Sequence, residues 1–263
     1  MAKDFICFLG TGGARFVVSR QLRSTGGTWC CFNGTHICID PGPGTLVRCF
    51  AGEDQLNPEE LDAVILSHRH LDHSADANVM VEAMTRGAFQ KRGALFAPAD
   101  ALEGEEPVVF RYLRRAAERV EVLGEGGVYR VKGIDFSTPV GHLHGVETYG
   151  LIFTLPFGRI AFITDTLFFP GLASHYRGAD LLILNVVLLK HPGHQKIKHL
   201  DLEDAEKIIS EIKPRQAFIT HFGTTMLDHD PPSLASSLSS RTGIPVAAAE
   251  DGQRVDIRET LRK

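Results

Sequence analysis

Four side chains that can bind a metal ion lie in one short segment, Ser67-His-Arg-His-Leu-Asp-His73. They are His68, His70, Asp72 and His73. The apolar residues before them, Ala63-Val-Ile-Leu66, are typical of a buried strand. The ligands therefore follow a strand end, where α/β proteins usually carry their chemistry. Imidazole and carboxylate groups together suit zinc, manganese or iron(II), so the segment favours a metal site over a solvated polar loop.

Three later segments place the same kinds of side chain after an apolar stretch. They contribute His142 and His144, then Asp165, then His221. Each of these, taken singly, is more typical of a hydrogen-bonded loop residue. Their combination with the first segment predicts one site that is assembled from several strand ends.

The rest of the sequence predicts the elements that position these loops. Asn33-Gly34 predicts a hairpin between Trp29–Phe32 and His36–Ile39. Further strands are expected at Asp4–Leu9, Leu95–Ala97, Glu121–Leu123, Gly127–Val131, Ile134–Phe136, Tyr149–Leu155, Arg159–Ile163, Asp180–Leu184, Gln216–Thr220 and near Val246. Helices are expected at Thr45–Phe50, Ser74–Arg86, Val108–Arg119 and Leu202–Ile212, and a final helix is expected before Val246. Asp201, with Asp204 three residues later, is expected to cap the start of the Leu202–Ile212 helix. Strands followed by helices, twice, predict two face-to-face sheets with helices outside.

Composition narrows the class of protein. The 263 residues are 43% hydrophobic, enough for one large domain or two closely fused halves, and the net charge of -4 gives no overall reason to expect nucleic acid. The longest apolar stretch, Leu181–Leu189, is interrupted by Asn185 and is too short to span a membrane. The first residues are typical of a strand and not of a signal peptide. The five cysteines, Cys7, Cys30, Cys31, Cys38 and Cys49, are odd in number, which predicts buried thiols in a cytoplasmic protein and no disulfide framework.

The order of these motifs resembles that of the metallo-β-lactamase superfamily. Phe8-Leu-Gly-Thr-Gly-Gly13 and Ile39-Asp-Pro-Gly42 also look like the early strand turns of that family. The resemblance covers nearly the whole chain and implies a single domain over 1–263: an α/β fold, a four-layer αββα sandwich of two mixed β-sheets with helices on the outer faces. His144-Gly-Val-Glu-Thr-Tyr-Gly150 has the spacing of the ribonuclease Z and cyclic phosphodiesterase branch, which is the most similar branch.

The resemblance implies two divalent metal ions, with zinc favoured over manganese or iron. His68, His70 and His144 would hold one ion; Asp72, His73 and His221 would hold the other; Asp165 would bridge them. A bridging hydroxide would attack phosphorus or a carbonyl carbon, and Asp72 would orient it. His199 resembles the proton donor of the branch, although a surface histidine beside a helix cap is the alternative.

Several nearby residues have less specific signals. His142 does not match the family spacing and is expected behind the ligands or facing the substrate. His191 and His194 could line the mouth of the site, and Asp40 could either orient a ligand histidine or cap a turn. Arg15, Arg20 and Arg23 are more typical of a solvated loop than of a phosphate site.

The function that these motifs favour is hydrolysis of small or cyclic phosphodiesters. A lactonase or other carboxyl-ester hydrolase is the alternative, followed by a ribonuclease Z-like transfer RNA endonuclease and by a non-catalytic metal-binding protein. Transfer RNA is disfavoured because the chain lacks a long glycine- and proline-rich arm and has Leu184-Asn-Val-Val187 before His199. β-Lactam hydrolysis is disfavoured because no cysteine is suitably placed for the second metal site. Oxygen reduction by a diiron protein is disfavoured because that branch has a glutamate where this chain has His70. The expected partner is a small phosphodiester or ester, with nucleic acid less favoured, no membrane, and a homodimer left open.

Overall fold

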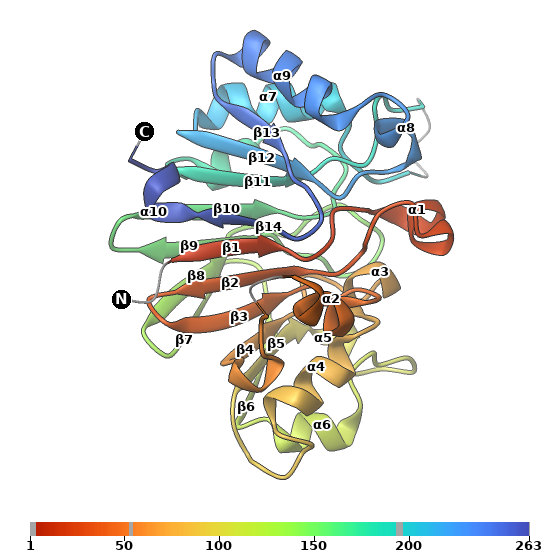
Figure 1. Ribbon diagram of the computed structural model, residues 1–263, viewed down its shortest axis with the longest axis vertical. Coiled ribbons are helices and arrows are strands. Elements are labelled where there is room, and N and C mark those ends of the chain that lie inside the picture. Colours follow the sequence, from red (N-terminus) through yellow and green to blue (C-terminus); the bar gives the residue numbers. More distant parts are fainter. Residues whose placement is uncertain (1–3, 53–54, 193–196, 263) are drawn as a thin grey trace.

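Two seven-stranded sheets lie face to face in the computed structural model, which describes residues 4–52, 55–192 and 197–262 (Figure 1). The first sheet has the order β14 (Gln253–Asp256), β1 (Phe5–Phe8), β2 (Thr28–Phe32), β3 (Thr35–Ile39), β4 (Ala63–Ile65), β5 (Ala94–Pro98) and β6 (Arg119–Leu123). The second has the order β13 (Val246–Ala248), β12 (Gln216–Thr220), β11 (Leu181–Asn185), β10 (Gly158–Ile163), β9 (Leu151–Leu155), β8 (Ile134–Thr138) and β7 (Gly127–Val131).

Each sheet is antiparallel on one side and parallel on the other. Strands β3 to β6 are parallel, as are β10 to β13, while the remaining neighbours are antiparallel. The carboxyl ends of parallel strands meet at one edge of a sheet, and ligands of open α/β sheets bind there. The loops after β4, β10 and β12 therefore converge at one end of the sandwich.

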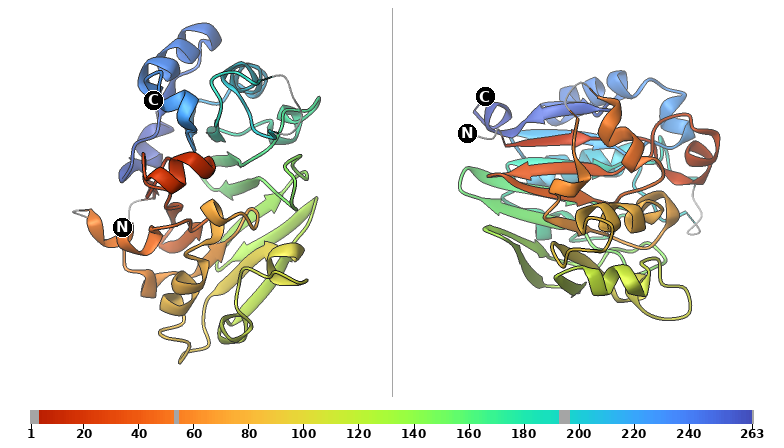
Figure 2. Two further views of the ribbon diagram at one scale, coloured as in Figure 1. Left: turned by 90° about the vertical axis from the view of Figure 1, so that its right-hand side faces the viewer. Right: turned by 60° about the horizontal axis from the view of Figure 1, so that its bottom comes forward.

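Helices cover the outer face of each sheet. The first sheet is covered by α2 (Thr45–Ala51), α4 (Ala77–Met84), α5 (Ala99–Leu102) and α6 (Arg111–Ala116), and the second by η2 (Ala173–Tyr176), α7 (Leu202–Ile212) and α9 (Pro231–Thr242). Short helices α1 (Ala14–Arg20), α3 (Leu71–Ser74) and α8 (Thr224–Leu227) lie at the loop end of the strands (Figures 1 and 2). Two more, η1 (Pro58–Glu60) and α10 (Ile257–Thr260), complete the described helices. The predicted four-layer αββα sandwich is confirmed.

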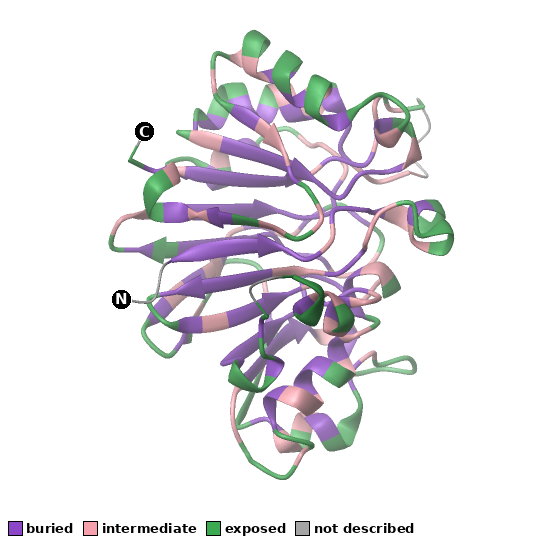
Figure 3. Ribbon diagram, in the orientation of Figure 1, coloured by how far each residue is buried: buried purple, intermediate pink, exposed green. Residues whose placement is uncertain are grey.

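Aromatic side chains fill the space between the two sheets. Phe32 of β2 contacts Phe153 of β9 with ring centroids 5.1 Å apart, and Phe153 also contacts Phe136 at 5.4 Å. The central strands are almost wholly buried (Figure 3) because one face lies on this inner core and the other lies under helices, whereas most residues of the edge strands β6 and β7 are not buried. The loop ends of the strands therefore project from a rigid support. In the part of the chain that the structure describes, no helix is long and apolar enough to cross a membrane.

Asp201 begins α7 as the sequence predicts. Its carboxylate accepts a hydrogen bond from the backbone N–H of Asp204 at 2.9 Å, and the Asp204 carboxylate bonds the Asp201 N–H in return. We expect Asp201→Ala to lower the free energy of unfolding by about 1 kcal/mol, because a buried helix start loses its acceptor. Urea denaturation measures this. Glu203→Ala is the control, because its exposed pair with Lys207 contributes little; an equal loss in both variants would contradict the capping role.

Two predicted helices have different bounds in the structure, and strand pairing accounts for the first difference. Val108–Arg119 is not one helix: α6 spans only Arg111–Ala116, and Ala117 is extended (φ -63°, ψ 141°). The chain leaves the helix there because the N–H of Glu118 bonds the carbonyl of Gly93, and Arg119 then pairs with β5. The helix predicted over Ser74–Arg86 is confirmed only between Ala77 and Met84, as α4, while Ser74 ends α3. Strand β14, which pairs with β1, and helix α1 were not predicted.

Candidate metal centre

All seven predicted metal ligands lie together at the loop end of the strands. They come from four segments: the loop after β4 with α3, the loop between β8 and β9, the end of β10, and the end of β12. The seven are His68, His70, Asp72, His73, His144, Asp165 and His221. The structure thus assembles, from residues far apart in the sequence, the set of side chains that the motifs indicated.

One cluster consists of three histidines. Nε2 of His144 lies 2.9 Å from Nδ1 of His70, and Nε2 of His68 is buried without a hydrogen-bond partner. The other ring nitrogen of His144, Nδ1, donates to the carbonyl of Lys198 at 2.9 Å. Because that bond holds the proton on Nδ1, Nε2 presents a lone pair to the cluster.

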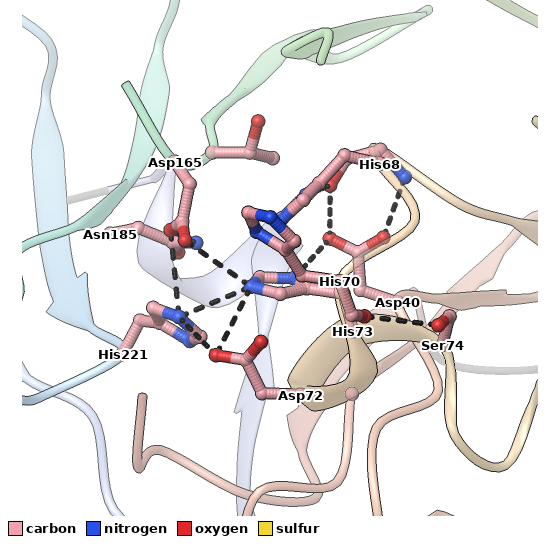
Figure 4. A network of polar contacts seen from close by, with 12 residues as sticks. Asp40, His68, His70, Asp72, His73, Ser74, Asp165, Asn185 and His221 are labelled. Atoms are coloured by element: carbon pink, nitrogen blue, oxygen red, sulfur yellow. Dashed lines mark hydrogen bonds and ion pairs between the residues drawn. The ribbon is translucent and has the colours of Figure 1, made fainter. Parts of the chain in front are cut away.

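A second cluster combines a carboxylate with two imidazoles. Nε2 of His73 lies 3.1 Å from Nε2 of His221, and Oδ2 of Asp72 lies 3.5 Å from the same His221 nitrogen. Nδ1 of His73 donates to Oδ2 of Asp40 at 3.0 Å, which turns the Nε2 lone pair towards the cluster. Figure 4 shows Asp72, Asp165 and His221 around the imidazole of His73.

Asp165 lies between the two clusters. Its Oδ2 is 3.4 Å from Nε2 of His73 and 3.6 Å from Nε2 of His144, and its Oδ1 is 3.5 Å from Nε2 of His221. The amide of Asn185 donates to Oδ1 at 2.9 Å. A buried carboxylate that contacts both groups of imidazoles is suited to join them.

The donor atoms fit divalent ions. Two nitrogen ligands about 2.0–2.1 Å from a tetrahedral zinc ion lie roughly 3.3 Å apart, close to the 3.1 Å that separates the facing nitrogens of His73 and His221. Lone pairs aimed at one another repel unless a cation or proton lies between them. Nε2 of His68 also calls for a cation or a proton, because it is buried without a hydrogen-bond partner and such an atom costs free energy. Nitrogen and carboxylate oxygen together suit zinc, manganese or iron(II).

The electrostatics differ between the two clusters. Burial lowers the pKa of His68, His70 and His144, so the first cluster is neutral, the form in which imidazole binds metals. Burial also opposes charge on His221, but Asp165 and Asp72 outweigh it and raise its pKa to about 9.

The pKa of His73 is raised in the same way by Asp165, Asp72 and Asp40 against the effect of burial. The facing Nε2 atoms of His73 and His221 are 3.1 Å apart, too close for both of them to carry a proton. A divalent cation held by the same carboxylates resolves that conflict.

The two aspartates of the centre are ionised. Burial alone would raise the pKa of Asp165, but the imidazoles of His221, His199 and His73 hold it well below its usual range. The pKa of Asp72 is likewise depressed by His73 and His221 despite burial. Two ionised aspartates in a largely buried site favour positive charge between them.

Groups behind the ligands fix their orientation. Asp40 accepts from the N–H and the hydroxyl of Ser67, both at 2.6 Å, as well as from His73. Asp40 and His221 both have left-handed backbones, with φ of 51° and 61°. Such conformations cost energy in residues other than glycine and cluster at functional sites.

Backbone groups hold the other side of the centre. The N–H of Ala14 donates to Oδ2 of Asp72 at 3.1 Å, and Gly13 lies so close to His221 that a Cβ at this position would be 2.3 Å from the imidazole. This close approach explains the glycine at position 13. Arg15 and Arg20 lie on α1 and not on the solvated loop that was expected. Arg23 donates to the hydroxyl of Thr11 at 3.1 Å.

The remaining histidines have different environments. Nδ1 of His199 lies 3.4 Å from Oδ2 of Asp165, and burial lowers the pKa of His199 although Asp165 acts against this. His142 faces away from both clusters, since it bonds the hydroxyl of Tyr176 at 2.7 Å and that of Thr164 at 3.2 Å. His191 bonds the carbonyl of Ile197, so its described contacts are not with the ligands. His194 lies outside the described residues.

Comparison with known proteins settles the family. Residues 35–222 match the Beta-lactamase superfamily domain. The chain belongs to the metallo-β-lactamase superfamily. With the histidine and aspartate clusters described above, this membership makes the protein a metal-dependent hydrolase.

This metallo-β-lactamase superfamily member is similar in sequence or structure to three proteins of known sequence. The uncharacterized protein MJ1374 of Methanocaldococcus jannaschii is 34% identical over 260 residues, 96% of this chain and 94% of the relative. Ribonuclease Z of Methanopyrus kandleri is 46% identical over 68 residues, 26% of this chain and 23% of that protein. The crystal structure of YhfI from Bacillus subtilis has a TM-score of 0.77 at 18% identity, covering 96% and 99% of the two chains, and it supports the fold alone.

Proposed function

We propose that the protein hydrolyses small or cyclic phosphodiesters with two divalent ions bound. The observation that carries the proposal is the position of Asp165, whose carboxylate contacts members of both ligand clusters. A shared carboxylate between two ions is suited to in-line displacement at phosphorus, because both the attacking and the leaving oxygen need positive charge nearby. The local identity to a ribonuclease Z, an enzyme whose name denotes phosphodiester cleavage, supports the same chemistry.

The chain's own residues have distinct roles in this proposal. His68, His70 and His144 would hold one ion, Asp72, His73 and His221 the other, and Asp165 both. Zinc is the favoured metal, with manganese or iron as alternatives. When bound, the ions would supply a water that is ionised near neutral pH and positive charge opposite the phosphoryl oxygens.

Two side chains would handle protons. Asp72 is half-buried, its Oδ2 is held by the N–H of Ala14, and it would accept the hydrogen bond that orients the attacking water. The water oxygen forms a bond to phosphorus while one ester P–O bond breaks. The protonated form of His199 would give its proton to the departing oxygen, and the proton that the attacking water loses would restore it, so the products are a phosphomonoester and an alcohol. Because burial lowers the pKa of His199, this form is the minor one at neutral pH.

A direct comparison of substrates tests the reaction class. We expect the metal-loaded protein to hydrolyse bis-p-nitrophenyl phosphate with a higher kcat/KM than a simple lactone. A lactone rate that exceeds the phosphodiester rate would instead establish the carboxyl-ester alternative. Equal inertness towards both would favour a protein in which the metals serve only binding or stability.

His199→Ala separates proton donation from metal binding. His144, Asp165 and His199 could together hold an ion, so a liganding role for His199 is a real alternative. We expect the variant to keep its metal content and to lose about a hundred-fold in kcat on an alkyl phosphodiester, because alkoxides leave poorly without a proton. The rate on a p-nitrophenyl ester should fall much less. Loss of metal, or an equal fall on both substrates, would contradict the role as donor.

A cytoplasmic location is also proposed. Its support is the burial of the five cysteines, Cys7, Cys30, Cys31, Cys38 and Cys49. Burial raises the pKa of Cys30 and Cys38, which makes these thiols unreactive in the reducing conditions we expect. Nucleic acid as a substrate and a homodimeric assembly are secondary proposals, and gel filtration tests the latter.

A further inference from the structure

The carboxylate of Asp251 holds the loop that follows β1. Its Oδ1 accepts hydrogen bonds from the backbone N–H and from the hydroxyl of Thr11, both at 2.8 Å. Its Oδ2 accepts from the backbone N–H of Ser24, also at 2.8 Å. Hydrogen bonds to an ionised acceptor are stronger than those between neutral groups. One carboxylate therefore fastens both ends of the segment 11–24, which contains Gly13 and α1.

Strand pairing brings this carboxylate to the loop across almost the whole chain. Asp251 lies in the turn between β13 and β14, 240 residues after Thr11. Strand β14 is antiparallel to β1, with Gln253 opposite Phe8, so the turn before β14 lies beside the residues that leave β1 (Figure 1). The N–H of Gly252 donates to the carbonyl of Phe8 at 2.7 Å and fixes this position.

The loop that Asp251 holds also supports the backbone of a ligand. The carbonyl of Thr11 accepts from the N–H of Phe222 at 2.7 Å, and the N–H of Gly13 donates to the carbonyl of Phe222 at 3.0 Å. Phe222 directly follows the ligand His221, whose backbone is left-handed with φ of 61°. Such a conformation persists only where the surrounding structure holds it, and these two bonds are part of that support.

The same loop contacts the side chains of two ligands in the second cluster. The N–H of Ala14 donates to Oδ2 of Asp72 at 3.1 Å. Gly13 lies against His221 so closely that a Cβ at position 13 would be 2.3 Å from the imidazole. A displacement of the loop would therefore change the positions of both Asp72 and His221.

The first cluster is held by other parts of the chain. Nδ1 of His144 donates to the carbonyl of Lys198 at 2.9 Å, and Nδ1 of His68 lies 3.0 Å from the hydroxyl of Ser67. Neither Lys198 nor Ser67 belongs to the segment 11–24. A change at Asp251 should therefore affect the second cluster more than the first.

We infer that Asp251 is a positioning residue for the ion of the second cluster. This inference rests on the two-ion centre of the proposed function. Ligands that are already fixed in the binding geometry need no reordering when the ion enters, so groups behind the ligands raise metal affinity. Asp251 acts through Thr11 and the loop, and it fixes Asp72 and His221 without contacting the ion.

Asp251→Asn tests this role by zinc titration of the metal-free protein against a chromophoric chelator. Asparagine keeps the size of the side chain but replaces one acceptor oxygen by an amide that cannot accept from Ser24 or Thr11. We expect the wild type to bind two zinc ions. In the variant, one zinc affinity should be unchanged and the other about ten-fold weaker, the typical cost of losing a group behind a metal ligand.

Activity at two zinc concentrations separates lost affinity from lost chemistry. At limiting zinc, kcat of Asp251→Asn on bis-p-nitrophenyl phosphate should fall in parallel with occupancy of the weaker site. Excess zinc should restore it, because every ligand and His199 remain in place. Thr11→Val, which removes the hydroxyl bonded to Asp251 and keeps the backbone N–H, should weaken the same ion to a smaller extent.

Asp4→Asn is the matched control. Asp4 is 1% exposed and precedes β1, at the opposite end of that strand from Thr11. Its carboxylate accepts from the N–H of Asn33 and from Arg258, so it also connects β1 to the last residues of the chain. This substitution should lower stability in urea and leave both zinc affinities unchanged.

Unchanged zinc affinities in Asp251→Asn, an equal weakening of both ions, or the same weakening in Asp4→Asn would overturn the positioning role of Asp251. Wild-type protein that binds fewer than two zinc ions would overturn the two-ion centre on which the inference rests. If the zinc affinities change as expected but no phosphodiester is cleaved, the proposed reaction fails and the role of Asp251 stands.

Discussion

Asp165→Ala is expected to abolish the metal centre and with it nearly all activity. The carboxylate contacts imidazoles of both clusters, at 3.4 Å from His73, 3.6 Å from His144 and 3.5 Å from His221. Its removal leaves these histidines without the negative charge that offsets a divalent ion. We expect kcat/KM to fall by about three orders of magnitude or more, since metal ions contribute several kcal/mol to such reactions. Metal analysis of the purified variant should show less than the wild-type content.

Asn185→Ala is expected to have a smaller effect on metal content and activity than Asp165→Ala. Its amide only orients Asp165, through a hydrogen bond of 2.9 Å to Oδ1. Loss of such an orienting partner typically costs about 10- to 100-fold in metal affinity or activity. An Asp165→Ala enzyme with wild-type metal content and wild-type rate would contradict the assignment of Asp165 as the joint ligand.

Gly42→Ala is expected to destabilise the fold and to disturb the site together. A Cβ at this position would lie 2.0 Å from the carbonyl oxygen of Asp72 and 2.2 Å from that of Thr25. Both neighbours are backbone atoms, so no flexible side chain can move aside. We expect the free energy of unfolding to fall by about 3 kcal/mol, and activity to fall because the backbone of Asp72 must shift. Chemical denaturation and kcat/KM on bis-p-nitrophenyl phosphate measure the two effects.

Gly52→Ala is the matched control for this steric argument. Gly52 ends α2 with φ -88°, and nothing lies within 4 Å of a Cβ built there. This substitution should change stability by less than about 0.5 kcal/mol. A Gly42→Ala protein as stable and active as Gly52→Ala would show that the close packing of Gly42 on the Asp72 backbone is not required.

The fold was predictable where local signals agree with the final pairing. The turn Asn33-Gly34 joins β2 and β3 as expected, and Asp201 caps α7. The prediction of a helix over Val108–Arg119 was wrong at its end, because the helical periodicity of the sequence continues past Ala116 whereas Arg119 pairs with β5. Strand β14 could not be foreseen, because Phe5 pairs with Asp256 across almost the whole chain.

In the candidate site, too, residues with a local sequence signal were predictable and residues placed by long-range pairing were not. His68, His70, Asp72 and His73 were identifiable because their spacing is dense and a uniformly apolar strand precedes them. Asn185 had no such signal, since in the sequence it only interrupts an apolar stretch. Its amide reaches Asp165 because β10 and β11 pair in parallel, with Ile163 opposite Leu184. The contact of Ala14 with Asp72 likewise depends on backbone placement, which the side-chain pattern does not encode.

Metal content measured against activity tests the central claim most directly. Elemental analysis of the purified, active enzyme should find about two transition-metal ions per chain. Chelation should remove the ions and the phosphodiesterase activity in parallel, and addition of zinc or manganese should restore both. Full activity in protein that contains no stoichiometric transition metal would contradict the account, because the paired imidazoles of His73 and His221 would then have no role in the reaction.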